Sequence, residues 1–292
     1  MTRPPAEAPL GTVAALWRYP VKSMGGEPVE AAELTERGLL GDRVYALLDR
    51  ETGTVVSAKH PRRWPSLLAC SAGFVAPPRP GEPPPPVRIT LPDGTMVRSD
   101  DPDVDALLSR ALGRAVALVT SVPGTPLREA DRTPVGAEGG EREIRREPLA
   151  RGAPPGTFFD YGPAHLLTTA TLAFLQTRYP EGCFDPRRFR PNLLVDTGAA
   201  VGLVEHAWLG RGLATGAARA PAIDPCPRRV VTTLPQGDLP RDPGILRAIT
   251  AHSAAPSATL APGVVFPAVA GIYLATVAGG QIRRGDQVLL LP

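Results

Sequence analysis

Turn-forming residues interrupt the apolar segments of this chain so often that long helices have little room to form. The 292 residues include 36 Pro and 30 Gly. Proline lacks a backbone donor and glycine loses the most entropy on ordering, so both favour turns between short elements. Apolar runs such as TVAALWRYPV and DRVYALLD recur at intervals of about ten residues, which is typical of small antiparallel barrels and sandwiches. The sequence therefore predicts a mainly β fold with a few helices, of class α+β.

A minority of segments carry a helical pattern. Thr168 or Thr169 suits the N-cap of one helix, because a hydroxyl there accepts a hydrogen bond from the first turn. The β-branched run 228–234, RRVVTTL, is interpreted as a strand. The expected helices cover residues 101–113, 165–180 and 242–252.

A polar segment, residues 123–157, separates two apolar halves and is rich in Gly and Pro. This composition predicts a long surface loop or linker, and it permits the segment to move as a lid. The chain is also long enough for two packed cores. We therefore expect two domains, residues 8–122 and residues 123–292, with the loop at the start of the second.

Arginine carries almost all of the positive charge. The net charge is +3, and Lys22 and Lys59 are the only lysines. A charge this small, without basic and aromatic residues clustered together, argues against nucleic acid as a partner. No apolar run reaches the ~18 residues of a membrane span, and three cysteines far apart form no disulfide framework. We therefore expect a cytoplasmic protein without a membrane partner that acts on a small molecule.

The segment YPVKSMGGE places Lys22 and Ser23 at the end of a strand, before a Gly-Gly turn. Turn amides, an ammonium and a hydroxyl can together bind an oxyanion. An exposed lysine at a hairpin edge is the alternative interpretation. Asp42 and Arg43, at the start of another strand, also have two interpretations. In the first, Arg43 points into a pocket. In the second, Asp42 and Arg43 are a solvated charged pair at a turn.

The segment DPRRFRPN crowds Arg187, Arg188 and Arg190 into one turn, next to Asn192. Like charges this close repel, so a bound anion or nearby carboxylates would relieve them. A solvated basic loop is the alternative. The four histidines show no zinc-binding spacing, and His165 is interpreted as a residue at the start of a helix rather than a base.

Seven segments, in order along nearly the whole chain, resemble the MOSC superfamily in its form with an N-terminal MOSC β-barrel domain. LWRYPVKSMGGEPV and RGLLGDRVYALLD resemble the N-terminal part. HLLTTATLAFL, DPRRFRPNLLVD, WLGRGLATG, VVTTLPQGDLPRDPGILRAI and GIYLATVAGGQIRRGDQVLLL resemble the MOSC part. The resemblance implies two β-barrel-like parts, the C-terminal one a barrel of the pyruvate-kinase type.

The resemblance also implies a molybdenum cofactor (molybdopterin) held between the two parts. Members such as the mitochondrial amidoxime-reducing component reduce N-hydroxylated compounds with electrons from a separate protein. An anionic pterin phosphate needs the charge-assisted donors that lysine and arginine supply. The positions that match the family's cofactor-binding motifs are Lys22, Ser23, Arg43, Arg190, Asn192, Thr232 and Thr233.

The chain departs from the family at one position. In the family's usual motif a cysteine directly precedes the VVTT run and its thiolate ligates molybdenum, but here Arg229 occupies that place. A guanidinium cannot replace soft thiolate ligation. Cys226 lies three residues earlier, and residues three apart on a strand face opposite sides. Cys226 can therefore replace the missing ligand cysteine only if residues 225–227 bend.

Three functions stay open at this point. The first is an oxidoreductase that keeps molybdenum, through Cys226 or the cofactor dithiolene alone, and reduces N-oxygenated compounds with a separate electron-transfer protein. The second is a metal-free enzyme of the same fold, in which Arg229 contacts another anionic substrate, in a specialised biosynthetic pathway. The third is a non-catalytic binder of pterin or cofactor.

Overall fold

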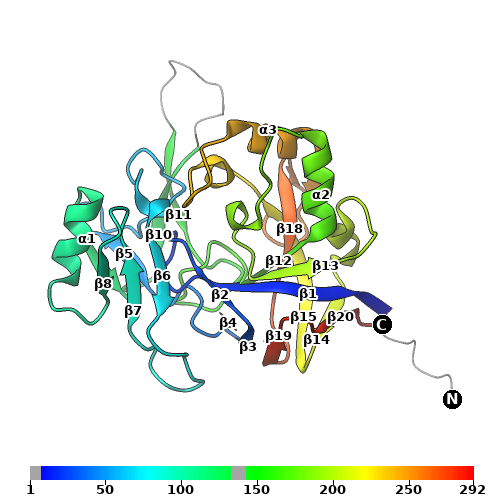
Figure 1. Ribbon diagram of the computed structural model, residues 1–292, viewed down its shortest axis with the longest axis horizontal. Coiled ribbons are helices and arrows are strands. Elements are labelled where there is room, and N and C mark those ends of the chain that lie inside the picture. The colour runs from blue at the N-terminus through cyan, green and yellow to red at the C-terminus, as the bar shows by residue number, and fades with distance from the viewer. Residues whose placement is uncertain (1–7, 133–142) are drawn as a thin grey trace.

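A closed barrel of seven strands is the central feature of the computed structural model (Figure 1), which describes residues 8–132 and 143–292. Strand β1 pairs with both β13 and β20 and so closes the ring. Strands β12 and β13 are parallel, and the other neighbours are antiparallel. In spatial order the strands are β13 (Leu193–Asp196), β12 (Ala164–Thr168), β18 (Val269–Leu274), β15 (Ala218–Pro227), β14 (Gly212–Thr215), β20 (Gln287–Leu290) and β1 (Ala8–Arg18).

Apolar side chains fill the barrel, and two helices cover part of its outside. Val13, Leu166 and Ile272 belong to the barrel core and are each at most 1% exposed. Helices α2 (Thr169–Arg178) and α3 (Pro243–His252) share a second core with strand residues. Figure 1 shows both helices on the same side of the barrel, near β18. The barrel and its helices thus form one packed unit.

The N-terminal part consists of small sheets around their own core. Helix α1 (Val104–Leu112) packs on this core and ends at Gly113, which adopts the left-handed conformation that glycine tolerates. The sheets are β5 (Ala46–Asp49) with β9 (Val116–Val119), and β6 (Ser71–Phe74) with β7 (Val87–Thr90) and β8 (Met96–Arg98). The remaining short strands are β2 (Glu27–Val29), β3 (Ala31–Thr35), β4 (Gly38–Leu39), β16 (Ala255–Pro256), β17 (Val265–Phe266) and β19 (Gly280–Arg283). The prediction of a mainly β fold with a few helices and a C-terminal barrel is confirmed.

The chain crosses between the two parts more than once. Strand β1 lies in the barrel, although the sequence assigned it to the N-terminal domain, and β3 pairs with β19 from the end of the chain. The domain limits of 8–122 and 123–292 stay a prediction. Because backbone pairs join distant segments, the interface between the two parts is a fixed feature of the fold.

The predicted loop at residues 123–157 is corrected in the described residues. Strands β10 (Leu127–Asp131) and β11 (Ile144–Pro148) pair along their whole length as an antiparallel hairpin. The isolated bridge between Val55 and Arg128 ties this hairpin to the N-terminal part. The polar composition of this segment suggested a loop. In the structure the backbone groups of the two strands bond to each other, and their charged side chains form ion pairs across the hairpin. The part of the loop over 133–142 lies outside the described residues.

Two other predicted elements change type. The predicted helix at 165–180 begins as strand β12, and its cap is Thr168, whose Oγ1 accepts a hydrogen bond from the Thr171 amide at 3.1 Å. The run 228–234, predicted as a strand, contains a 3-10 helix, η4 (Val230–Thr233). At 165–168 the pairing with β13 and β18 overrides a helical pattern, and at 230–233 tertiary packing overrides the strand preference of β-branched residues. The helices expected near 101–113 and 242–252 are confirmed.

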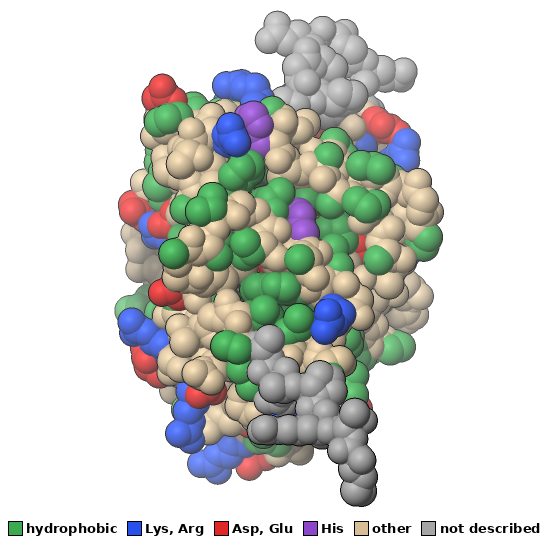
Figure 2. All heavy atoms as spheres, turned by 90° about the vertical axis from the view of Figure 1, so that its right-hand side faces the viewer, with side chains coloured by type: hydrophobic (Ala, Val, Ile, Leu, Met, Phe, Trp, Pro, Cys, Tyr) green, Lys and Arg blue, Asp and Glu red, His purple; other side chains and the backbone are tan. Residues whose placement is uncertain are grey.

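The face at the barrel end carries few charged side chains over its centre. Figure 2 shows that Lys and Arg lie mainly toward the edge of this face, among apolar and uncharged groups. Among the described residues, no helix is long and apolar enough to cross a membrane.

Candidate functional site

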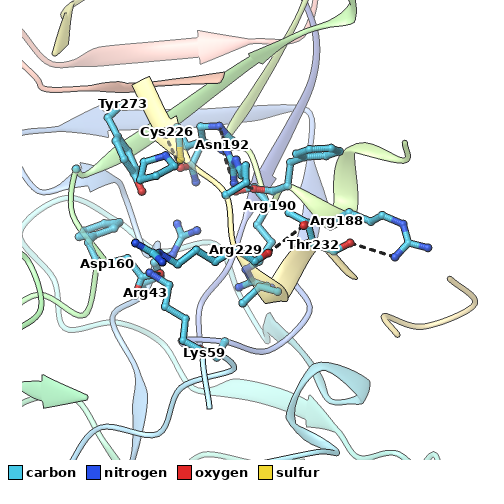
Figure 3. A pocket seen from close by; sticks show the side chains of 18 of the residues that line it. Arg43, Lys59, Asp160, Arg188, Arg190, Asn192, Cys226, Arg229, Thr232 and Tyr273 are labelled. Carbon is cyan, nitrogen blue, oxygen red and sulfur yellow. Dashed lines mark hydrogen bonds and ion pairs between the residues drawn. The ribbon is translucent and has the colours of Figure 1, made fainter. Parts of the chain in front are cut away.

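A cavity lies where the N-terminal part, the residues after the β10–β11 hairpin and the rim of the barrel meet. Its volume is about 100 Å³. Figure 3 shows side chains from all of these segments directed into it. We call it the first cavity. The charged, polar and thiol side chains in its wall are Lys22, Ser23, Arg43, Lys59, Asp160, His165, Arg188, Arg190, Asn192, Cys226, Arg228, Arg229, Thr232 and Tyr273.

One carboxylate, Asp160, holds three cations together at the floor of this cavity. Lys22 Nζ donates to Asp160 Oδ1 at 2.8 Å, and Lys59 Nζ lies 3.0 Å from Oδ2. Arg128 Nη1, from β10, donates to Oδ1 at 2.5 Å. Lys22 also donates to the Phe158 carbonyl at 2.8 Å. The cluster therefore carries a net positive charge although each cation has a partner.

The charge cluster shifts the protonation of its members. Burial lowers the pKa of Lys22 to about 7, and Asp160 only partly opposes this effect. Burial and the neighbouring Arg128 lower the pKa of Lys59 to about 8. Although burial favours the neutral acid, Lys22 and Lys59 hold the pKa of Asp160 well below its usual value. Both lysines thus exchange protons close to neutral pH.

A second carboxylate, Asp42, orders the opposite wall. Its Oδ1 accepts a hydrogen bond from the Tyr19 amide at 2.7 Å, and its Oδ2 accepts one from Asn192 Nδ2 at 3.0 Å. Arg43 donates to the same Oδ2. Asp42 is only 2% exposed. The interpretation of Asp42 and Arg43 as a solvated turn is therefore wrong, because the pair is buried and joins three distant segments.

Arg190 is a cation of the first cavity with a buried, unused donor. Its Nη1 donates to the Met24 carbonyl at 2.6 Å, and its guanidinium carbon lies 4.3 Å from the centre of the Tyr19 ring. Its Nη2 is buried and has no hydrogen-bond partner among the described residues. Burial lowers the pKa of Arg190 to about 10, so the side chain stays charged at neutral pH. A buried donor without a partner costs about 1–3 kcal/mol, which a bound acceptor would recover.

Backbone strain is concentrated at this cavity. Four non-glycine residues have positive φ in the described chain, and three of them, Ser23, Arg43 and Arg190, line the cavity. Their φ values of 65°, 51° and 55° lie in the left-handed region that such residues rarely adopt. Strained positions of this kind cluster at binding sites, where the surrounding structure holds them in place.

The strand that carries Cys226 is bent. The pairing of β15 with β18 shifts register between Pro225 and Pro227, which marks a bulge at Cys226. The condition for Cys226 to reach the site is thus met, and its side chain lines the cavity. Tyr273 lines the same wall, and burial raises the pKa of the Cys226 thiol.

Arg229 directly follows this bend and precedes η4. The side chain is exposed, and neither a hydrogen bond nor an ion pair joins it to another described residue. Thr232 and Thr233 donate their hydroxyls to the carbonyls of Arg229 and Val230 inside η4. Thr232 lines the cavity, whereas Thr233 is buried behind it and does not. The contact of Thr233 with a ligand stays a prediction, and in the structure its hydroxyl helps to shape η4.

Three further polar residues in the wall are satisfied by the protein itself. Arg188 is 1% exposed and donates to four backbone carbonyls, among them that of Thr232 at 3.3 Å. Arg228 donates to the Phe189 and Ala270 carbonyls and to His165. Burial and Arg228 hold the pKa of His165 well below its usual value. His165 lies on β12, not at the start of a helix, and is neutral.

The structure brings together most of the residues predicted from the sequence. Lys22, Ser23, Arg43, Arg190, Asn192, Thr232, Cys226 and Arg229 line one cavity. Their proposed contacts with a ligand stay predictions. Asn192 spends its amide on Trp17, Asp42 and the His165 backbone, so it positions neighbours rather than offering free donors. Arg187 pairs with Asp185 and Asp238 outside the cavity.

Sequence reasoning missed Lys59, Asp160, Arg128 and Tyr273. One signal in the sequence pointed to Lys59, because it is one of only two lysines in the chain. In the structure both lysines bind the same carboxylate. No local pattern marks Asp160 or Tyr273. Among the described residues, no group of three or more His, Cys, Asp or Glu side chains is placed to hold a metal ion.

Comparison with protein families accounts for both parts of the fold. Residues 10–76 match the MOSC N-terminal beta barrel domain, and residues 155–289 match the MOSC domain. The chain is a MOSC-domain protein. The MOSC match covers every barrel strand except β1, which the N-terminal match contributes. The cavity is therefore built by residues of both matches, and Arg228 and Arg229 on the barrel rim belong to the MOSC match.

Known proteins are similar to this MOSC-domain chain over shorter stretches. Human mitochondrial amidoxime-reducing component 1 is 43% identical over 65 residues, 21% of this chain and 19% of that protein. Mitochondrial amidoxime reducing component 2 of Macaca fascicularis is 45% identical over 69 residues, 22% and 19% of the two chains. The matched stretches span about a fifth of these relatives. The YUAD protein from Bacillus subtilis aligns over 96% of this chain and 94% of its own, with 10% identity and a TM-score of 0.42.

Proposed function

We propose that the first cavity binds the phosphate-bearing pterin of molybdenum cofactor, and that the protein is an oxidoreductase for N-oxygenated compounds. The observation that carries the proposal is Arg190, whose buried Nη2 has no partner among the described residues. Lys22, Lys59 and Arg43 add positive charge to the same wall. A phosphate would accept the free N–H of Arg190 and offset the excess charge of the Asp160 cluster.

The metal half of the cofactor has one matching side chain in the wall. Molybdenum favours soft thiolate ligands, and Cys226 supplies the cavity's single thiol among the described residues. The bulge at residues 225–227 turns that thiol toward the cavity. When bound, the cofactor would supply the two-electron redox chemistry. Tyr273 lines the same wall and would help to hold the thiol of Cys226 in position.

The reaction itself needs protons as well as electrons. Reduction of an N–O bond consumes two electrons and two protons and releases water. Lys22 and Lys59 exchange protons near neutral pH, so their ammonium groups are suited to supply protons inside the cavity. The electrons would come from a separate redox protein. The name of the human relative states only that it is an amidoxime-reducing component. The cytoplasmic location stays a prediction.

A metal-free enzyme is the second candidate, and Arg229 favours it. Its guanidinium lies in the wall without a partner among the described residues, where it attracts an anion and repels a metal cation. Burial also raises the pKa of Cys226, which keeps the thiol protonated and weakens it as a ligand. The same positive wall would then bind an anionic substrate, or a pterin without catalysis.

Molybdenum content separates these candidates. We would produce the wild type, Cys226→Ser and Arg229→Cys in a host that makes molybdenum cofactor, with Cys183→Ser as the matched control for an exposed thiol outside the cavity. The proposal predicts near-stoichiometric metal in the wild type and control, and loss in Cys226→Ser. A wild type without molybdenum that gains it in Arg229→Cys would overturn the redox proposal and favour the metal-free enzyme.

A further inference from the structure

A second cavity adjoins the first and shares part of its wall. Both cavities are lined by Lys59, Arg228 and Arg229. The second cavity has a volume of about 190 Å³ and lies between the β10–β11 hairpin and helix α3. Arg229 thus stands at the boundary between the two cavities. Figure 3 shows Arg43, Lys59 and Arg229 directed toward the same space beside Asp160.

The wall of the second cavity has two chemically different sides. Val230, Leu246, Pro267 and Ala268 make an apolar side along η4, α3 and the start of β18. A side of this kind favours the apolar body of a small molecule, because burying apolar surface away from water is favourable. Shape and chemistry together indicate a ligand with one apolar and one charged end.

The other side of the second cavity carries four cations, Lys59, Arg132, Arg228 and Arg229, and one carboxylate, Asp131. It is therefore cationic on balance, and it has unused donors. Arg229 is exposed and has neither a hydrogen bond nor an ion pair with the described residues. Arg132 pairs with Glu147, but its buried Nη1 has no hydrogen-bond partner among the residues that the structure describes. These two guanidinium groups come from different segments. Both would gain from an acceptor in the cavity.

We propose that the second cavity binds a monocarboxylate with a compact apolar body, whose carboxylate Arg229 holds where the two cavities share their wall. The planar fork of a guanidinium matches the two oxygens of a carboxylate and forms two parallel hydrogen bonds. The apolar side accommodates the rest of the molecule. The proposal names the substrate class of the site, and it rests on the proposed function for the first cavity as the cofactor site.

Benzoate is a suitable probe, and benzamide is its neutral counterpart of the same shape. We would titrate each into the full-length protein by calorimetry at pH 7. Saturable binding of benzoate at least about tenfold tighter than that of benzamide supports the proposal. Equal binding of the two, or no saturable binding of benzoate or of hexanoate up to about 10 mM, overturns it.

Three variants locate the binding. Arg229→Gln should weaken benzoate about tenfold or more and leave benzamide unchanged. Thr250→Trp places a large ring in the cavity from an exposed position of α3 and should abolish benzoate binding. Arg247→Gln removes an exposed arginine on the same helix outside both cavities and should bind benzoate like the wild type. Wild-type affinity in Arg229→Gln would overturn the proposal, even if Thr250→Trp failed to fold.

This experiment is separate from the test of molybdenum binding. Benzoate binding without molybdenum in the wild type would leave the second-cavity proposal standing and overturn only the redox function. Molybdenum in a wild type that binds neither benzoate nor hexanoate would support the redox function and overturn only the second-cavity proposal. The two failures are therefore distinguishable.

Discussion

Removal of the Asp160 carboxylate should destabilise the protein far more than removal of one of the cations that it binds. Asp160→Asn leaves Lys22, Lys59 and Arg128 close together without their shared counterion. Breaking a buried ion pair by removing one partner costs about 3–5 kcal/mol. Because the Asp160 side chain is 35% exposed, solvent screens part of this repulsion and we expect about 3 kcal/mol at pH 7.

Lys22→Met provides the matched comparison. This variant removes an ammonium whose side chain is 3% exposed but leaves Asp160 paired with Lys59 and Arg128. Loss of the desolvation cost offsets most of the lost attraction, so the free energy of unfolding should change by about 1 kcal/mol or less. The methionine side chain is close to lysine in length, so Lys22→Met keeps the cavity wall filled.

Urea unfolding of the three proteins at pH 7 and pH 10 tests this reasoning. At pH 10 the penalty of Asp160→Asn should shrink, because Lys22 and Lys59 then lose their protons and repel Arg128 less. Equal destabilisation by the two substitutions at pH 7 would show that Asp160 does not hold the cations together. A penalty of Asp160→Asn that stays constant with pH would contradict the assigned role of the lysines.

Four more outcomes follow from the structure. The pKa of Lys22 is about 7 in the folded protein and 10.5 in a free lysine, so between these pH values the unfolded chain binds more protons than the folded one. The free energy of unfolding of the wild type should therefore rise with pH in this range. Urea unfolding of Lys22→Met should show a smaller rise. Sulfate stays fully ionised from pH 6 to pH 9, so its affinity by calorimetry should fall by about tenfold or more as Lys22 and Lys59 deprotonate, and a constant affinity would place the anion elsewhere. Arg190→Gln should weaken sulfate at pH 6 because the free Nη2 donor is lost, and it should lower the urea midpoint modestly because the Nη1 hydrogen bond to the Met24 carbonyl is lost as well. Gly271→Ala should lower thermal stability by about 3 kcal/mol or more, because Gly271 has φ of 76° and its new Cβ would overlap His165.

Local signals gave the parts of this protein that depend on near neighbours. Glycine and proline spacing predicted short strands, and the helix at 242–252 was recognisable because Asp242 caps it and Pro243 occupies its first position. The same reasoning failed at 165–180 and 228–234. Five consecutive buried residues of β12 look helical in isolation, and only their pairing with β13 and β18 makes them a strand.

The binding residues were predicted in part because arginine and lysine were crowded near turns. The sequence placed Lys22, Arg43 and Arg190 as donors for an anion and identified Arg229 as an unusual cation in its motif. Whether Cys226 reaches the cavity depended on a bulge, and a bulge is set by the register between β15 and β18. A register belongs to a pair of strands, so one strand's sequence does not reveal it.

The sequence by itself determined the fold class, the MOSC resemblance and the positive character of the site. The tertiary structure alone decided which charges are satisfied. Asp160 binds Lys22 across 138 positions of the chain and Arg128 across 32, whereas Arg190 keeps a buried nitrogen without a described partner. Coulomb and hydrogen-bond energies depend on distance in space and on burial, and neither quantity is written in the order of residues along the chain.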